Sequence, residues 1–322
     1  MLVTGATGKV GAAIVRALLA SGMTVRALVR NPARADLPSD VEPVVGDLRD
    51  GSGLEDAVEG CCTVYNAAGL PEQWVADSAA FFEVNAAGTR LLAEAAARAG
   101  AQRFVHTSTI DVFDAARGEM FDENQLSPRA RSSPYQRSKQ AAEYAAFELA
   151  SVIEVVVINS AAVLGLPART QSLERSLIEP ALDDRLPVLP PGGLNLVSAD
   201  SLADAHLRGA RLGRAGERYI VSDGYLTVRE LVDMGLAAVG KQRVPPSLPQ
   251  LAAVAIARMS ESWAHFRRRP PIIAKDQLVN LLWQARASSA KAEHELGWRP
   301  SPLGETIAAL ARMLAPLAPE EP

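Results

Sequence analysis

The sequence is poor in the residues that form disulfide frameworks and metal centres. Its 322 residues include only two cysteines, Cys61 and Cys62, and neighbouring cysteines rarely bridge each other. The four histidines are scattered along the chain without the spacing of a metal-ligand set. Because unpaired cysteines are typical of a reducing compartment, we expect a cytoplasmic protein with small buried thiols and no metal site.

Long apolar runs and a strong charge of one sign are also absent. A membrane-spanning helix needs about 18 consecutive apolar residues, and Glu154 and Arg258 limit the longest runs, at 151–166 and 251–259. The chain does not open with a charged segment followed by an apolar stretch, so no signal peptide is expected. The formal net charge of −4 lacks the basic excess of a nucleic-acid-binding protein. These features favour a soluble protein that acts on a small molecule.

What the chain does contain is an alternation of short β-branched runs with alanine-rich helical stretches. Strands are expected at residues 2–4, 24–29, 41–45, 63–66, 103–108 and 155–158, and helices at 10–21, 53–59, 81–99 and 135–151. Strands that are apolar almost throughout and alternate with helices indicate a parallel sheet covered on both faces. The pattern predicts an α/β fold with a Rossmann-type, doubly wound parallel sheet.

The second half of the chain has a different composition. Proline and glycine become dense after residue 166, although a strand at 218–221 and helices at 228–239 and 277–285 are still expected. We therefore predict a dinucleotide-binding domain over 1–165. Residues 166–322 should form a smaller, irregular α/β lobe that mainly binds substrate and is intertwined with the sheet.

The first predicted strand runs directly into a glycine-rich turn that opens a helix. Such a turn presents backbone N–H groups and the positive end of the helix dipole to a pyrophosphate. The glycines stand three residues apart, and the alternative is a structural turn without a ligand. The strand begins at Met1 and is short for a central strand, so the natural start is expected a few residues earlier. The residues expected to hold the cofactor here are Thr4, Gly5, Thr7, Gly8, Lys9, Val10 and Gly11.

The end of the second strand selects between NAD and NADP, because its side chains reach the adenosine ribose. An acidic residue there would accept from the 2′-hydroxyl and repel a 2′-phosphate. This chain has Val29 and Arg30 instead, and a guanidinium can bind a phosphate through two parallel hydrogen bonds. We predict a preference for NADP; the alternative is a surface arginine that stacks on adenine. Asp47 and Leu48, at the end of the third strand, are expected to contact the adenine.

A phenol and an ammonium stand four residues apart at Tyr135 and Lys139, and therefore on one face of a helix. Hydride transfer at a carbon that bears oxygen needs a proton delivered to, or removed from, that oxygen. Lowering the pKa of a phenol from about 10 to near 7 requires roughly 4 kcal/mol. A neighbouring ammonium can supply part of this stabilisation. A hydroxyl at the end of the preceding strand, Thr107-Ser108-Thr109, can bind the same oxygen.

Four motifs in order resemble the extended short-chain dehydrogenase/reductases: TGATGKVG at 4–11, NAAG at 66–69, TSTIDVF at 107–113 and YQRSK at 135–139. The resemblance spans nearly the whole chain. It implies that Tyr135 is the acid/base, that Lys139 is its partner and that Thr109 completes the triad, with Ser108 as the reserve hydroxyl. It further implies that Asn85 supports Lys139 through water. The cofactor contacts it implies are Asn66, Ala67, Ala68, Thr107, Tyr135, Lys139, Ala162 and Val163, and Trp74, Ser108, Thr109 and Tyr135 are predicted to contact substrate.

The chain departs from the nucleotide-sugar members of that family. Those enzymes typically carry an arginine that clamps the diphosphate, and Asn195 or its neighbours stand there instead. Together with the ending SSAKAEHELGW at 288–298, this resembles the dihydroflavonol reductase and 3β-hydroxysteroid dehydrogenase branch. It implies a largely apolar alcohol or ketone as substrate. Two alternatives stay open: a nucleotide-sugar epimerase or dehydratase, and an NmrA-like redox sensor that binds NADP without turnover. A homodimer through the helices at 81–99 and 135–151 is expected from the resemblance.

Overall fold

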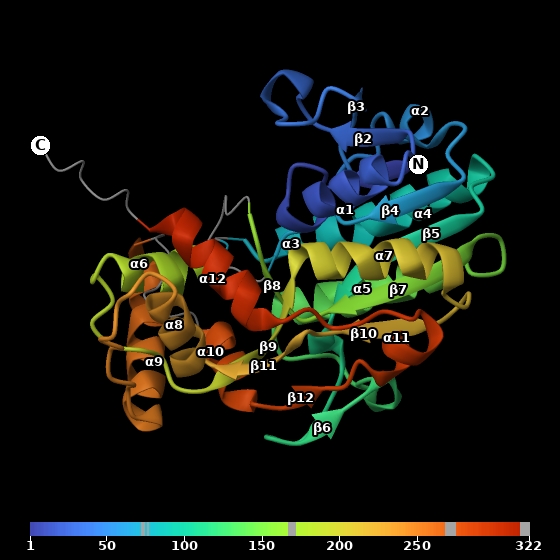
Figure 1. Ribbon diagram of the computed structural model, residues 1–322. Coiled ribbons are helices and arrows are strands. Elements are labelled where there is room, and N and C mark those ends of the chain that lie inside the picture. Colours follow the sequence, from blue (N-terminus) through green and yellow to red (C-terminus); the bar gives the residue numbers. More distant parts are fainter. Residues whose placement is uncertain (72–74, 76, 167–171, 268–274, 316–322) are drawn as a thin grey trace, which may run out of the picture.

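A seven-stranded parallel sheet forms the centre of the computed structural model (Figure 1). The structure describes residues 1–71, 75, 77–166, 172–267 and 275–315, and the side chains of 261–275 are excluded. Along the sheet the strand order is β10-β7-β5-β4-β1-β2-β3, and every neighbouring pair is parallel. The strands are β1 (Leu2–Thr4), β2 (Val25–Val29), β3 (Val41–Val45), β4 (Thr63–Asn66), β5 (Arg103–Thr109), β7 (Glu154–Ser160) and β10 (Arg218–Val221).

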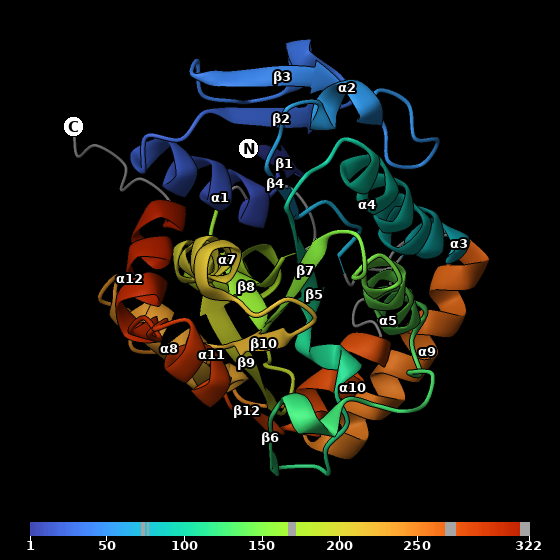
Figure 2. The same cartoon turned by 90° about the vertical axis from the view of Figure 1, so that its right-hand side faces the viewer.

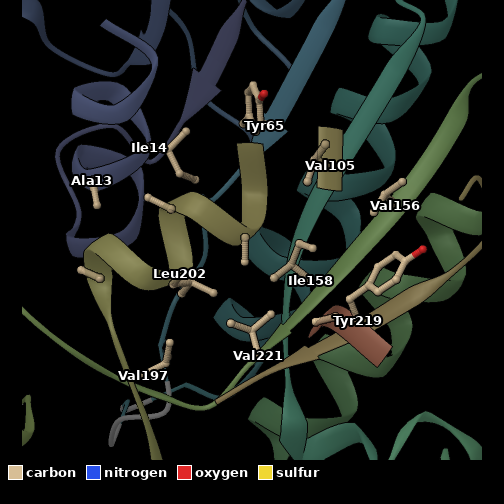
Figure 3. Packing of buried hydrophobic residues seen from close by; sticks show 14 of the residues in the cluster. Ala13, Ile14, Tyr65, Val105, Val156, Ile158, Val197, Leu202, Tyr219 and Val221 are labelled. Atoms are coloured by element: carbon tan, nitrogen blue, oxygen red, sulfur yellow. The ribbon is translucent and has the colours of Figure 1, made fainter. Parts of the chain in front are cut away.

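Helices cover both faces of this sheet (Figure 2). On one face lie α1 (Lys9–Ala20) and α7 (Ala199–Leu212), which contribute Ile14 and Leu202 to a core that reaches Ile158 (Figure 3). The opposite face is covered by α2 (Leu54–Val58), α4 (Gly88–Arg98) and α5 (Pro134–Phe147). The predicted doubly wound, Rossmann-type α/β fold is therefore confirmed.

Two predicted helices differ from the sequence expectation in ways that matter for the site. The helix expected at 81–99 consists of α3 (Ala79–Phe81), a π-helical turn η2 (Phe82–Ala87) and α4. Helix α5 ends at Phe147, four residues before the predicted end. It begins with Pro134 after a capping box between Ser133 and Gln136, which fixes the first turn that carries Tyr135.

The second half of the chain contributes both to the sheet and to a separate layer. Strand β10 and helix α7 belong to the central sheet unit. The other elements surround a three-stranded sheet of β8 (Ala162–Leu164), β9 (Gly193–Ser198) and β11 (Gly224–Thr227) and a two-stranded sheet of β6 (Met120–Phe121) and β12 (Arg286–Ala287). These elements include η5 (Glu174–Ile178), α6 (Glu179–Leu182), α8 (Val228–Ala237), α9 (Gln250–Arg267), α10 (Lys275–Trp283) and α12 (Leu303–Leu314). Helix α11 (Ala290–Glu295) instead packs on β10 and adds Ala292 to the core of the central sheet.

This second layer has its own apolar core, in which Leu164 of β8 packs with Ile178, Leu231 and Ile307. The division at residue 165 into a cofactor domain and a substrate lobe stays a prediction. No helix in the described part of the chain is long and apolar enough to cross a membrane.

Candidate active site at the carboxyl edge of the sheet

The glycine-rich turn after β1 is held tightly against the end of β4. Gly5 has a positive φ of 67°, and the amide of Gly8 donates to its carbonyl at 2.8 Å. A Cβ on Gly5 would lie 2.6 Å from the carbonyl oxygen of Ala67, and one on Gly11 only 2.2 Å from that of Gly5. Only glycine therefore fits at these two positions without a shift of the backbone.

The first turn of α1 suits an anion. Gly8 is the N-cap residue and supplies no side-chain acceptor, and no acidic residue lies in the first turn. The leading amides of the helix, those of Lys9, Val10 and Gly11, therefore combine with the positive end of the helix dipole. This is the arrangement that a pyrophosphate needs, and the residues fit a dinucleotide. The Lys9 side chain does not join this cradle, because it pairs with Glu174 at 2.9 Å.

The ends of β2 and β3 carry two arginines around one carboxylate. Arg49 donates through Nε to both carboxylate oxygens of Asp47, at 3.0 and 3.1 Å, and this hydrogen bond holds the pKa of Asp47 below its usual range. The charge of Arg30, which directly follows β2, lowers that pKa further. Arg30 is exposed, whereas Leu48 is buried in the core under α4. The contact predicted between Leu48 and adenine stays a prediction.

The end of β4 is fixed by a buried hydrogen-bond network. Thr4 donates to Asn66 at 2.8 Å and accepts from the amide of Ala68 at 3.1 Å. The Asn66 amide reaches Thr89 of α4 at 2.9 Å and Nδ1 of His106 on β5 at 3.2 Å. The side chains of Thr4 and Asn66 are thus used to position the strand end, where Ala67 and Ala68 are half-buried. The cofactor contacts predicted for Thr4, Asn66, Ala67 and Ala68 stay predictions.

Lys139 crosses from α5 to the end of β5. Its side chain is only 6% exposed, and Nζ donates to the carbonyl oxygen of Thr107 at 2.7 Å. Burial lowers the pKa of Lys139 to about 8, and the Glu143 carboxylate works in the opposite direction. Tyr135 lies one turn earlier on the same face, with its ring in an edge-to-face contact with Phe81, 5.9 Å between centroids. With a pKa of about 8, Lys139 is an ammonium at pH 7, and it lies on the helix that also carries Tyr135, one turn away.

The two hydroxyls predicted for the triad, those of Thr109 and Ser108, differ in their hydrogen bonding. Thr109 Oγ1 donates to the carboxylate of Asp111 at 3.0 Å and accepts from the Asp111 amide at 3.2 Å. Ser108 Oγ is buried and finds no hydrogen-bond partner among the described residues. A buried hydroxyl without a partner is costly unless a ligand or water satisfies it. Ser108 directly follows Thr107, whose carbonyl oxygen binds Lys139, and its hydroxyl, unpartnered within the described chain, makes it as strong a candidate as Thr109 for binding a ligand oxygen.

Asn85 lies in the π-helical turn η2 and joins three segments of the site. Its Oδ1 accepts from the amide of Leu70 at 2.7 Å, and its Nδ2 donates to the carbonyl oxygen of Leu70 at 3.1 Å. The same Nδ2 donates to Ser138 Oγ at 3.0 Å, and Ser138 in turn donates to the carbonyl oxygen of Tyr135. A π-turn of this kind is frequent at functional sites because it redirects one side chain. The predicted water-mediated support of Lys139 stays a prediction.

Sequence reasoning missed two buried histidines, His106 on β5 and His206, which contacts the end of β5. His206 Nε2 lies 2.7 Å from Thr107 Oγ1, and burial lowers the pKa of His206 to about 4. Burial also lowers the pKa of His106 well below its usual value, with a further contribution from the Lys139 charge. His106 lies on β5 itself, whereas only the packing of α7 on the sheet brings His206 to the site. The predicted substrate residue Trp74 lies outside the described residues.

The remaining predicted contact lies on β8. Ala162 and Val163 are half-buried, and the carbonyl of Val163 accepts from Lys9 at 2.8 Å. The structure thus brings the glycine loop, the ends of β4 and β5, the Tyr135–Lys139 face and β8 to one edge of the sheet. Open α/β folds bind their ligands at this edge.

Comparison with known proteins decides the family. Residues 1–220 match the family described as "NAD dependent epimerase/dehydratase family". The chain belongs to this family. The predicted resemblance to the extended short-chain dehydrogenase/reductases, and with it an NAD(P)-dependent enzyme, is confirmed.

Two of the similar proteins have names that refer to sterols or steroids. "Sterol demethylase protein B" of Methylococcus capsulatus is 32% identical and covers 98% of this chain and 97% of its own. A "3-beta-hydroxysteroid dehydrogenase" of Mycolicibacterium neoaurum is 29% identical, and the match covers 93% of this chain and 87% of that protein. Among solved structures, the Thermus thermophilus UDP-glucose 4-epimerase complex with NAD is similar, with a TM-score of 0.78 and 25% identity. The match covers 97% of this chain and 98% of the epimerase chain.

Proposed function

We propose that the protein is an NADP(H)-dependent oxidoreductase that interconverts a carbonyl and a secondary alcohol on a largely apolar small molecule. The observation that carries this proposal is the buried ammonium of Lys139, held at the end of β5 on the helix face that bears Tyr135. Burying a lysine costs free energy, so a buried lysine on the same helix face as a tyrosine indicates a functional site, at which the ammonium can stabilise a phenolate.

The bound nicotinamide would supply or accept the hydride at its C4 position. In the reducing direction, Tyr135 gives its proton to the substrate oxygen while the carbon gains the hydride, so that a carbonyl becomes an alcohol. Lys139 stabilises the phenolate that results, and Ser108 or Thr109 donates a hydrogen bond to the same oxygen. In the oxidising direction the phenolate takes this proton back.

The cofactor preference is supported by the two arginines at the sheet edge. No acidic residue ends β2, and the carboxylate of Asp47 is already bound by Arg49. Arg30 remains exposed to receive a 2′-phosphate. The dissociation constants of NADP⁺ and NAD⁺, measured by calorimetry for the wild type and for Arg30→Gln, test this. Tighter NADP⁺ binding that Arg30→Gln abolishes is the expected result; equal or tighter NAD⁺ binding contradicts it.

The apolar substrate is supported by the place that Asn195 takes. Its Nδ2 donates to the carbonyl oxygen of Ala285 at 2.9 Å, and its Oδ1 accepts from the amide of Ala287 at 2.9 Å. The side chain therefore holds β12 rather than facing an anionic ligand. The names of the two sterol-related relatives point in the same direction.

A substrate screen tests the activity directly. NADPH oxidation is followed with ketosteroids, flavonoid-like ketones, aldehydes and nucleotide sugars. We expect turnover with hydrophobic ketones. Tight binding and conversion of a nucleoside diphosphate sugar, without activity on ketones, would instead support the epimerase or dehydratase alternative.

Tyr135→Phe separates an enzyme from a redox sensor. The substitution should abolish turnover and leave the affinity for the dinucleotide nearly unchanged. Tyr144→Phe on the same helix is the matched control, because Tyr144 is exposed and should be dispensable. If the wild type turns over none of the ketones or alcohols, the sensor becomes the better description.

A further inference from the structure

An ion pair joins the glycine loop to the second layer of the molecule. Lys9, the first residue of α1, donates through Nζ to the carbonyl oxygen of Val163 at 2.8 Å and to both carboxylate oxygens of Glu174 at 2.9 Å. The Lys9 side chain is 16% exposed and that of Glu174 is fully buried. The donors of this ammonium are thus used within the protein, and its charge is directed away from the pyrophosphate cradle.

Glu174 also holds the chain that follows β8. Its Oε1 accepts from the amide of Gly165 at 2.7 Å, so one carboxylate binds both Lys9 and the backbone just after β8. Glu174 is the first residue of η5, whose Leu177 and Ile178 are buried in the core of the second layer. The carboxylate therefore connects three units: the phosphate helix, the end of β8 and this core.

A buried ion pair of this kind adds little net stability, because desolvation of both charges offsets their attraction. What it does provide is a fixed geometry. In this position it sets the spacing between the amides at the start of α1, which are expected to bind the pyrophosphate, and the β8 segment, which is expected to bind the nicotinamide half.

We propose that the Lys9–Glu174 pair is a positioning latch that couples binding of the pyrophosphate at α1 to binding of the nicotinamide half beside β8. This inference rests on the proposed dinucleotide site. Neither residue touches the reacting atoms. The latch aligns the two halves of the site before the cofactor enters, so that the whole dinucleotide binds more tightly than its adenosine end alone would suggest.

The test compares NADP⁺ with adenosine 2′-monophosphate, which lacks the pyrophosphate and the nicotinamide. Calorimetry gives both dissociation constants for Glu174→Gln, Lys9→Met and the double variant. We expect each variant to bind NADP⁺ about tenfold more weakly, with binding of the fragment unchanged. If the wild type prefers NAD⁺, then NAD⁺ and adenosine monophosphate replace this pair.

The double variant distinguishes positioning from stability. Each single substitution leaves a buried charge unpaired and should lower the Tm, whereas the double variant leaves none and should return the Tm towards the wild-type value. Its affinity for NADP⁺ should nevertheless stay low. Arg16→Gln is the matched control: it removes another ion pair between α1 and a distant segment, but Arg16 is 52% exposed and its partner Asp200 is 83% exposed.

Two results would overturn the latch: wild-type affinity for NADP⁺ in the double variant, or equal weakening of the dinucleotide and the fragment in the single variants. A wild type that binds neither ligand would instead refute the proposed cofactor site itself.

Discussion

Replacing the central ammonium of the site should stabilise the fold while it destroys activity. Lys139 is buried, and its pKa lies near 8 instead of the usual 10.5. At about 1.4 kcal/mol per pKa unit, the protonated side chain costs the cofactor-free fold about 3 kcal/mol at pH 7. Lys139→Met removes the charge and also the hydrogen bond to Thr107, which contributes about 1 kcal/mol. We expect the free energy of unfolding to rise by about 2 kcal/mol and the Tm by about 4 °C.

The pH dependence of the free energy of unfolding provides a second test of this prediction. The folded pKa of Lys139 is lowered, so between pH 8 and 10.5 the unfolded chain binds more protons than the folded one. The wild type therefore gains stability over this interval as its lysine discharges. The advantage of Lys139→Met is fully present below pH 8 and shrinks as the pH rises towards 10.5.

Chemical denaturation of the cofactor-free protein at pH 7 and pH 10 measures this difference, with turnover recorded on the same samples. Lys241→Met is the control, because that ammonium is 38% exposed and pairs with Asp184 at the surface. A variant that is less stable than the wild type at pH 7, or an advantage that does not shrink with pH, would refute the reasoning.

Three further predictions concern the same edge of the sheet. Gly11→Ala places a Cβ 2.2 Å from the carbonyl oxygen of Gly5 and so forces the turn to shift. Calorimetry should then show that dinucleotide binding is lost, and thermal denaturation should show a Tm that is lower by several degrees. Asn85→Ala leaves both backbone groups of Leu70 without their partner and displaces the α5 segment that Asn85 contacts through Ser138. Steady-state kinetics should therefore show a larger loss in kcat than in cofactor affinity. Burial raises the pKa of Asp111 above its usual 3.8, so ionisation costs the fold stability as the pH rises through the folded pKa. Asp111→Asn should therefore be more stable than the wild type at pH 7, and denaturation curves should show this advantage vanish below pH 3.8.

The fold could be predicted because its signals are local. The apolar runs of β1, β2, β4, β5 and β7 and the helices between them lie within a few residues of their predicted bounds, since a strand buried on both faces needs an uninterrupted apolar run. The glycine loop was found for the same reason: its tight turn and close approaches impose glycine at fixed spacing.

Other features depend on contacts between distant segments. The π-helical turn that orients Asn85 could not be predicted, because the same run of residues also suits an ordinary α-helix. His206 reaches Thr107 only because α7 packs over the sheet, and Glu174 reaches Lys9 across 165 positions of chain. The sequence predicted Lys9 as a cofactor residue, and the structure shows that its side chain has another partner.

By itself the sequence determined the class of fold, the glycine loop and the Tyr135–Lys139 face, because each is encoded in the spacing of neighbouring residues. Only the tertiary structure decided which polar groups are satisfied within the protein and which are left for a ligand. Thr109 is bound by Asp111 and Asn195 by the backbone of β12, whereas Ser108 is buried without a partner in the described chain. Hydrogen-bond satisfaction is a property of the packed site, where water is excluded and each donor must find an acceptor nearby.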